Sequence, residues 1–485
     1  MTLSVQFLRK ARLTFSISLL LLSSSGICQD IEFDIKQGAK AAKQIADSYA
    51  IDTVSIAAKY LSDVGYRLTR NLENQLFDYK FHLIDMSEPN AFALPGGYVY
   101  VTRGIITLLN NEDELAGIIG HEIIHAQNRH SYKASKKKVL PTILKAPGNV
   151  VGLVNEDLGN LINAPVNISS ALGLAKYGRK QEEEADAYGV RLAAKSGYRP
   201  AALATALENL SKDIEYLTGS KEKFSYFNDH PFTPERVENI RGISKNLSVA
   251  SQVPIASIKN GFLDKLSGIY IGKHPRQGVF DRNRFYHLDL DLDITFPPEW
   301  PLINSSTYVA ARQPKGAAMI YMIVLPGKLE PKEYGKAFIT RFRKKYRVES
   351  YRAEDLQING YPAYIFGIDE MSNGQKNNST LIWIKKDSIT YQIVGAGLKK
   401  YEKDFESVAG SITTLTEQTK ARVTGIVLSI AEAKEGESLE ELSTRTGNVL
   451  SLEYLTLING IQPGIALEGG QLLKTGIKKQ YLPGE

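Results

Sequence analysis

The pentapeptide His121-Glu122-Ile123-Ile124-His125 constrains this chain more than any other stretch. Positions i and i+4 of a helix share one face, so both imidazoles can bind one metal ion. Glu122 follows the first histidine and can reach a metal-activated water without being a ligand itself. Zinc lowers the pKa of such a water to about 7, and the carboxylate takes its proton as the water attacks a peptide carbonyl. The motif predicts a zinc hydrolase; the alternative is a surface helix with two unrelated histidines.

The residues around this motif predict a buried helix over residues 112–130. Asn111 is a favourable N-cap, and Glu114 stands three residues further on, as in a capping box. An apolar stripe at helical spacing follows, formed by Leu115, Ile118, Ile119 and Ile123. Buried histidine and glutamate side chains need polar partners, which favours a functional site.

A third metal ligand is expected from the acidic stretch that begins a second helix near residue 177. Glu182 and Asp186 stand at i and i+4, so Glu182 can bind the metal while Asp186 orients a ligand histidine. At about 100° per residue, Glu183 is displaced from that face and Glu184 points away from it. The alternative is an acidic patch in solvent.

Further segments complete a family pattern. These are Asn90–Thr102, His230-Pro231, Thr233 and Arg236. Together with His121, His125 and Glu182-x-x-x-Asp186, they resemble the zinc metallopeptidase family of the CAAX prenyl protease and the bacterial heat-shock membrane protease. In layout, the chain is most similar to the soluble periplasmic branch that includes the beta-barrel assembly-enhancing protease. That branch often carries tetratricopeptide repeats, but no 34-residue period is found here.

The resemblance implies a mainly helical, zincin-type domain with a small β-sheet and one zinc ion per chain. His121, His125 and Glu182 would hold the metal, with Glu122 as general base and Asp186 behind a ligand. His230 would be a displaceable fourth ligand or would polarise the scissile carbonyl, unless it is an ordinary loop histidine. Arg236 is expected in a structural ion pair. Ile124 departs from the small residue common in the family, but no ligand is lost.

Residues 1–28 are predicted to be a cleaved signal peptide, because basic residues precede a short apolar run and small residues. Cys28, the single cysteine, could instead mark a lipoprotein, although Ile27 disfavours this. A mature chain without cysteine suits the periplasm or secretion. Its net charge falls from 59 − 53 = +6 to 56 − 53 = +3, because the removed residues hold three basic and no acidic side chains. That weak excess gives no reason to expect nucleic acid as a partner.

The peptidase domain is predicted to cover residues 30–250. Residues 35–75 are expected to be helical, with Ile45, Ile51, Ile56 and Leu61 in the core. Strands are expected at 79–86 and 98–102, the second at the cleft edge, where an extended substrate could pair with it; an ordinary hairpin is the alternative. Residues 139–170, apolar but broken by Gly and Pro, are interpreted as a lid or as a membrane-surface segment.

An α+β domain of unknown role with one sheet is predicted for residues 265–418. The alternation from Tyr286 to Phe296 indicates one strand. Further strands are expected at 317–325, 361–368 and 380–395, the last with a turn at Lys386-Asp387, and helices at 331–346 and 400–418.

Residues 423–478 resemble a LysM module, a small βααβ fold that binds N-acetylglucosamine chains. The resemblance rests on Gly436-x-Ser438-Leu439, Asn459-Gly460 and Gly469-Gly470-Gln471. Peptidoglycan is therefore a candidate ligand, and a pure protein-contact role is the alternative.

The sequence thus predicts a multidomain zinc metalloendopeptidase of the cell envelope. By resemblance, its substrates would be unfolded or misassembled envelope proteins, and the outer-membrane assembly machinery is a candidate partner. The competing hypothesis is a chaperone-like or scaffolding factor at the cell wall with a latent or structural zinc site.

Overall fold

A computed structural model describes residues 31–131 except 48, 177–218, 226–251, 261–305, 308–345 except 326 and 328, and 351–484 except 373 and 463. The predicted signal peptide and the predicted lid lie outside these residues. The chain divides into two compact units. The first contains described residues up to 131, then 177–269 and 428–476, and the second contains 270–427 and the last residues from 477. Among the described helices, none has the length and apolar character needed to cross a bilayer.

A four-stranded sheet forms part of the first unit, with the strand order β1-β2-β4-β3. Its strands are β1 (Ile51–Asp52), β2 (Lys80–Ile84), β3 (Ala91–Leu94) and β4 (Tyr98–Thr102). β4 runs parallel to β2 and antiparallel to β3. The prediction that residues 98–102 form the cleft edge is therefore wrong, because β4 has a paired strand on each side and β3 is the edge strand. Ala-Phe-Ala-Leu is too short and too little branched to indicate a strand from its sequence.

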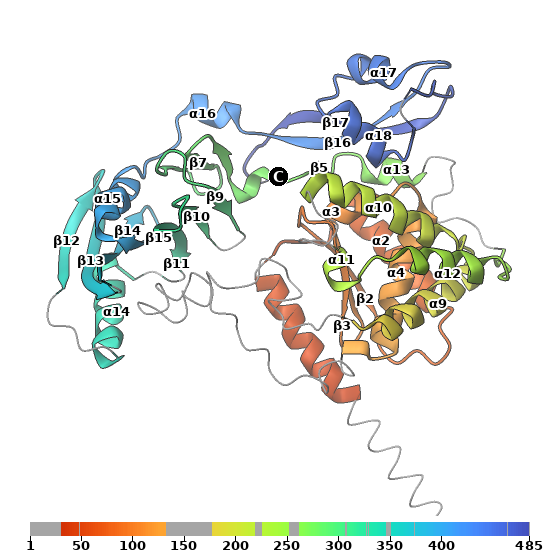
Figure 1. The fold of residues 1–485 in the computed structure, drawn as a ribbon, viewed down its shortest axis with the longest axis horizontal. Helices are drawn as coiled ribbons and strands as arrows, with labels where there is room; N and C mark the ends of the chain where they lie inside the picture. The colour runs from red at the N-terminus through yellow and green to blue at the C-terminus, as the bar shows by residue number, and fades with distance from the viewer. Residues whose placement is uncertain are drawn as a thin grey trace, which may run out of the picture. The chain divides into compact units, whose positions relative to one another are not determined.

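Helices beside this sheet make up the rest of the described residues 31–266 in the first unit (Figure 1). They are α2 (Ile56–Thr69), α3 (Arg103–Ile106), α4 (Glu112–Gln127), α9 (Arg179–Lys195), α10 (Ala202–Thr218), α11 (Tyr226–Asp229), α12 (Pro234–Ser244) and α13 (Gly261–Leu266), and residues 31–47 are also helical. The predicted helix over 35–75 is thus interrupted by β1. Ile45 and Leu61 are buried as predicted, whereas Ile56 is 65% exposed because it begins α2 on the solvent side.

Helix α4 begins at the predicted N-cap, Asn111, but Glu114 bonds the amide of Asn110 and not that of Asn111, so the capping box is not closed. The Asn111 side chain accepts a hydrogen bond from the Glu114 amide at 3.0 Å, and Glu114 in turn accepts from the Asn111 side chain and the Asn110 amide. Helix α4 meets α9 at two glycines, since a Cβ built on Gly189 would lie only 3.1 Å from the His121 nitrogen. This close approach brings the two predicted ligand helices together.

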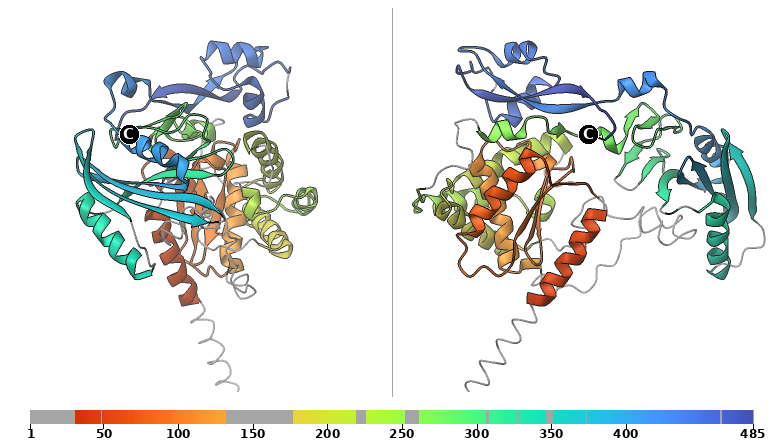
Figure 2. Two further views of the ribbon diagram at one scale, coloured as in Figure 1. Left: turned by 60° about the vertical axis from the view of Figure 1, so that its left-hand side comes forward. Right: turned by 180° about the vertical axis from the view of Figure 1, so that it is seen from behind.

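The second unit is built on a seven-stranded antiparallel sheet with the order β12-β13-β14-β15-β11-β10-β9. Its elements are β9 (Leu302–Asn304), β10 (Val309–Arg312), β11 (Ala318–Leu325), α14 (Pro331–Lys345), β12 (Arg352–Ile358), β13 (Tyr361–Ser372), β14 (Gln375–Lys386), β15 (Ile389–Leu398) and α15 (Glu402–Gly410). Alternate residues of β13 pack toward different helices, Ile365 with α15 and Phe366 with α14. The two helices therefore cover opposite faces of the sheet (Figure 2).

Two details of the second unit differ from the predictions. The stretch from Tyr286 to Phe296 is a hairpin of β7 (Arg284–His287) and β8 (Leu292–Thr295), which forms a second sheet with β6 (Val279–Asp281). The turn includes Asp291 at φ 45°, a left-handed conformation that alternating apolar residues do not reveal. The predicted helix over 400–418 is divided into α15 and α16 (Glu417–Arg422).

The C-terminal module, residues 424–480, has the predicted βααβ order. It contains β16 (Thr424–Glu432), α17 (Leu439–Arg445), α18 (Leu452–Ile458) and β17 (Leu472–Gln480). Within the first unit, α18 packs on α10, where the rings of Tyr454 and Tyr216 stack at 5.5 Å. The fully buried Lys474 donates hydrogen bonds of 3.0–3.1 Å to the carbonyls of residues 107, 108 and 109, just past α3.

Candidate metal centre

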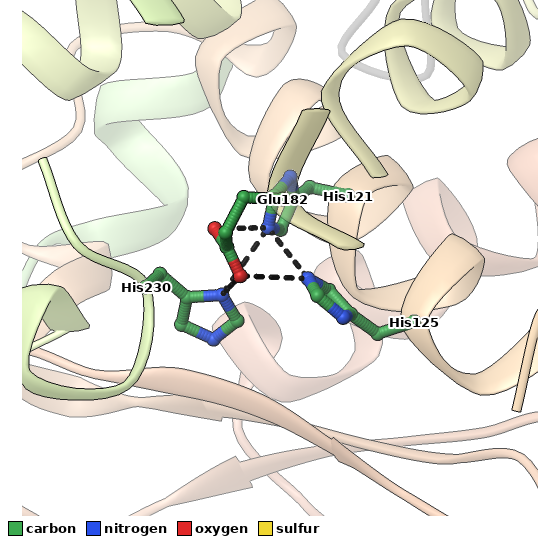
Figure 3. A group of neighbouring side chains, drawn as sticks. All are labelled: His121, His125, Glu182 and His230. Carbon is green, nitrogen blue, oxygen red and sulfur yellow. Dashed lines mark hydrogen bonds and ion pairs between the residues drawn. The ribbon is translucent and has the colours of Figure 1, made fainter. Parts of the chain in front are cut away.

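Four buried side chains meet between α4, α9 and the residue after α11 (Figure 3). They are His121, His125, Glu182 and His230, each at most 2% exposed, and one possible ligand atom from each lies within 4.8 Å of the others. The Nε2 atoms of His121 and His125 are 2.9 Å apart. The Glu182 carboxylate lies 3.5 Å from the first and 3.4 Å from the second.

His230 joins this group through Nδ1, which lies 3.2 Å from His121 Nε2 and 3.3 Å from Glu182 Oε1. The ring of Tyr226 stacks on His230 at 4.5 Å, and the His230 amide donates to the Tyr226 carbonyl, so α11 sets its position. The structure therefore places His230 next to the three predicted ligands. Whether it acts as a fourth ligand or polarises the scissile carbonyl stays open.

Asp186 and Arg236 support the group from behind. Asp186 Oδ1 lies 2.9 Å from His121 Nδ1, and Arg236 binds the same carboxylate with two hydrogen bonds of 2.8 Å. Burial alone would raise the pKa of Asp186, but Arg236 and His121 lower it. Arg236 also lies 2.9 Å from Glu182 and donates to the carbonyls of His230 and Pro231. The predicted structural ion pair of Arg236 is thus present, and it joins three parts of the centre.

Glu122 is fully buried beside the four side chains, with Oε1 at 3.5 Å from His230 Nε2. Its burial raises the pKa of this carboxyl to about 8. Neither of its oxygens accepts a hydrogen bond from the described residues. This carboxyl must be ionised before it can accept a proton, and a cation bound beside it would favour the ionised form.

The remaining groups respond to burial in different ways. Burial alone would lower the pKa of His121, but Asp186 and Glu182 raise it. The pKa of His125 falls well below its usual value because burial dominates. Burial alone would raise the pKa of Glu182, but His230, His121 and His125 hold it well below its usual range. An ionised carboxylate beside a neutral imidazole is the protonation state that metal binding requires.

This donor set fits zinc. Three imidazole nitrogens and one carboxylate oxygen match the ligand types and the number that zinc prefers. Of the three adjacent glutamates, Glu182 belongs to the group, while Glu183 is exposed and pairs with Arg179 at 3.1 Å. Glu184 is half-buried and lies 3.4 Å from His130 instead of pointing into solvent.

Two neighbours of His125 were not foreseen from the sequence. His130 Nδ1 lies 2.9 Å from His125 Nδ1, and the Tyr177 ring stacks on His125 at 3.8 Å. The only sign of His130 in the sequence is that it follows the two motif histidines closely. Its spacing of five residues from His125 is not a helical one, so it did not indicate a contact.

The comparisons with known proteins agree with this geometry. Residues 55–244 match the family model of peptidase family M48. The chain is 26% identical over 223 residues to the beta-barrel assembly-enhancing protease of Escherichia coli (strain K12), which covers 45% of each chain. It is 30% identical over 188 residues to Metalloprotease YcaL of the same organism, covering 38% of this chain and 68% of YcaL.

A further relative is the mitochondrial metalloendopeptidase OMA1 of Schizosaccharomyces pombe, at 28% identity over 216 residues and covering 43% of this chain and 60% of that protein. The chain spans less than half the length of the beta-barrel assembly-enhancing proteases that it matches. The identity with YcaL, the matching family model and the residues gathered around His121 together show that the chain belongs to peptidase family M48.

Proposed function

We propose that this protein is a zinc-dependent metalloendopeptidase of the cell envelope that cleaves unfolded or misassembled proteins. The observation that carries the proposal is the convergence of His121, His125, Glu182 and His230 beside the buried Glu122. Structural ion pairs also perturb buried groups, but they do not direct three imidazole nitrogens and a carboxylate at one point. One zinc ion per chain is the cofactor that this proposal requires.

In the proposed mechanism, His121, His125 and Glu182 hold zinc, and Asp186 orients His121 through Nδ1. Bound zinc would act as a Lewis acid for water and for the peptide carbonyl. Glu122 accepts the proton of the attacking water as general base, and then delivers it to the departing amine. Its burial keeps bulk water away, so the proton passes to and from a fixed carboxylate.

His230 gives the centre a second state. A catalytic zinc site keeps one position for water or substrate, whereas a structural site is closed by four protein ligands. With Nδ1 of His230 among the possible ligand atoms, four side chains would surround a bound zinc and close the site. We propose that substrate displaces His230, whose Nε2 then stays close to Glu122. This same observation favours the alternative function, a chaperone-like or scaffolding factor with a latent or structural zinc site.

The substrate class is inferred from strand β3 and from the relatives. β3 is an edge of the four-stranded sheet and packs against α4, next to the ligands. Its four residues are buried, so pairing with an extended substrate chain requires that this edge first become exposed. Strand pairing uses the backbone and tolerates many sequences, as cleavage of unfolded proteins requires. The name of the beta-barrel assembly-enhancing proteases supports envelope substrates and contact with the outer-membrane assembly machinery.

We also propose that the chain acts in the periplasm or outside the cell after removal of residues 1–28. The βααβ order of the C-terminal module supports a LysM-like domain, with peptidoglycan as its candidate ligand. Residues 30–250 would be the peptidase domain, and residues 265–418 an accessory α+β domain.

The test is to measure zinc content and casein cleavage of the purified mature chain, with and without a chelator. We expect about one zinc per chain and cleavage that the chelator abolishes and added zinc restores. The Glu122→Gln variant, purified in parallel, controls for a contaminating protease. A chain that retains zinc and binds unfolded protein or sacculi, but cleaves neither casein nor unfolded envelope proteins, would establish the scaffolding alternative.

A further inference from the structure

We propose that His130 and Glu184 hold the ligand His125 in its metal-binding tautomer, and so set the affinity of the centre for zinc. This inference rests on the proposed function, because it assumes that the centre binds zinc. It assigns a positioning role to His130, which contacts the ligand His125 but is not itself among the possible ligands, and to Glu184, which spacing alone places on the wrong side of its helix.

The end of helix α4 brings His130 to this position. On a continuous helix, a residue five positions after His125 would point about 140° away from it. However, α4 ends at Gln127, and Arg129 takes the left-handed conformation with φ 55°. The chain therefore turns back, and the fully buried His130 ring lies behind His125. Gln181 on α9 fixes this turn by donating to the His130 carbonyl at 3.0 Å.

The contact between the two rings determines where their protons lie. His125 Nε2 faces His121 and Glu182, so it must be unprotonated to bind a metal. The single proton of the neutral ring then lies on Nδ1, which is 2.9 Å from His130 Nδ1. His130 Nδ1 must therefore accept the hydrogen bond from His125 Nδ1. The single proton of neutral His130 then lies on Nε2.

Glu184 is the carboxylate beside the proton on His130 Nε2. Its Oε2 lies 3.4 Å from that nitrogen, an ion-pair distance without a formed hydrogen bond, and its Oε1 accepts a hydrogen bond of 2.6 Å from the Asn128 side chain. Asn128 is the C-cap residue of α4, so the same helix end holds both His130 and its carboxylate partner. The order of contacts is therefore His125, His130 and then Glu184, from the ligand group to the half-exposed edge of α9.

The two histidines of the motif thus receive different supports. His121 has a carboxylate directly behind it, Asp186 at 2.9 Å, whereas His125 has an imidazole with a carboxylate behind that. A hydrogen bond to the second nitrogen fixes the ring orientation and raises the basicity of a metal-bound imidazole. Loss of such a partner typically weakens metal affinity about 10–100-fold.

The test is the zinc affinity of purified variants, measured by competition with a chromophoric chelator. His130→Ala should weaken zinc binding about 10–100-fold, while the metal-free chain remains folded. His130→Asn should recover most of the affinity, because its side-chain oxygen can accept the proton of His125 Nδ1. Glu184→Ala should have a smaller effect than His130→Ala. Glu183→Ala is the matched control and should leave affinity unchanged, because Glu183 is exposed on the same helix.

A second readout follows the protons directly. The chain has seven histidines, so ¹⁵N-histidine labelling gives a sparse spectrum. In the zinc-loaded protein, His130 should be protonated on Nε2 and not on Nδ1. Zinc affinity of His130→Ala within about twofold of wild type would overturn the inference, as would protonation of His130 Nδ1. So would His130→Asn binding no better than His130→Ala when both are folded.

These outcomes are separate from failure of the proposed function. If the wild-type chain binds zinc but cleaves nothing, the proposed peptidase activity is refuted. The role of His130 behind His125 is still supported if the variants change zinc affinity as described. A wild-type chain without measurable zinc affinity overturns both.

Discussion

Helix α4 takes part in two buried charged groups, one near each end, and they balance their charges in different ways. The group near its first turn, the Lys474 cluster, consists of Lys474, Glu114 and Asp213, all at most 2% exposed. The group further along is the candidate metal centre of His121, His125, Glu182 and His230. Both take carboxylates out of water, which is unfavourable unless a positive partner accompanies them.

In the Lys474 cluster, the chain itself supplies the positive partner. Lys474 directs its three N–H donors at three main-chain carbonyls and has no lone pair to offer a metal. In the metal centre, imidazole nitrogens face a carboxylate, and each neutral imidazole offers a lone pair. Burial of charge therefore does not by itself identify a functional site; the kind of donor beside the carboxylates does.

The first prediction removes the carboxylate of the metal centre. Glu182→Ala should lose zinc on dialysis. Of the three proposed ligands only His121 and His125 would remain, and two ligands hold the metal weakly. Glu183→Ala should retain it, because Glu183 is exposed and pairs with Arg179 on the outside of the helix. Zinc stoichiometry after dialysis measures both. Full retention in Glu182→Ala with loss in the neighbouring variant would show that the ligand was misassigned.

The second prediction removes the proposed general base and leaves the metal ligands unchanged. Glu122→Gln should lower kcat for an unfolded substrate by about 10²–10⁴-fold, the usual contribution of a general base. Zinc content and the fold should not change, because the Glu122 oxygens are not among the ligand atoms. Turnover at the wild-type rate would exclude Glu122 as the base.

Local patterns allowed much of the metal centre to be predicted. The cap of α4, the pair His121–His125 and the face shared by Glu182 and Asp186 all depend on spacings of three or four residues within one helix. Such spacings are visible in a sequence. The long strands of the second unit were also predicted, because their apolar runs are broken by turns.

The unpredicted parts depend on backbone turns or on distant residues. His130 reaches His125 only because Arg129 is left-handed without being a glycine, and Asp291 turns its hairpin in the same way. Lys474 reaches the carbonyls of residues 107, 108 and 109 across 365–367 positions of sequence, and an isolated lysine in a strand gives no sign of burial. The edge strand β3 is only four residues long.

The third prediction tests the Lys474 cluster. Lys474→Met keeps the length of the side chain but leaves the three carbonyls and Glu114 without their cation. We expect it to lower the free energy of unfolding of the first unit by about 3–5 kcal/mol, as when one partner of a buried pair is removed. Lys478→Met, at an exposed position of the same strand, should change it by less than about 0.5 kcal/mol. Chemical denaturation measures both.

If the folded Lys474→Met chain also lost zinc affinity, the two groups on α4 would be coupled and the comparison between them would fail. We expect unchanged zinc affinity, because Glu114 precedes His121 by two helical turns.

The last prediction separates the two carboxylates of the Lys474 cluster. Glu114 accepts hydrogen bonds from the Asn110 amide and the Asn111 side chain, whereas neither Asp213 oxygen accepts one from the described residues. Burial raises the pKa of both, and that of Asp213 reaches about 7. Burial lowers the pKa of Lys474 to about 8, so it carries one positive charge below that pH. We expect Glu114 to be the carboxylate that balances this charge and Asp213 to be the one that resists ionisation.

The pKa of Asp213 in the unfolded chain is about 3.9, so its raised folded value favours the folded state at low pH. That contribution is complete below about pH 4 and is lost as the pH rises through about 7. Asp213→Asn cannot ionise, so it should be more stable than wild type at pH 8 and within about 0.5 kcal/mol of it at pH 4. Glu114→Gln should instead be less stable at pH 8 by about 1–3 kcal/mol, because the hydrogen bonds to a charged acceptor are lost. Denaturation of the three proteins at both pH values decides the matter: a destabilised Asp213→Asn at pH 8 would make Asp213 the ionised partner of Lys474.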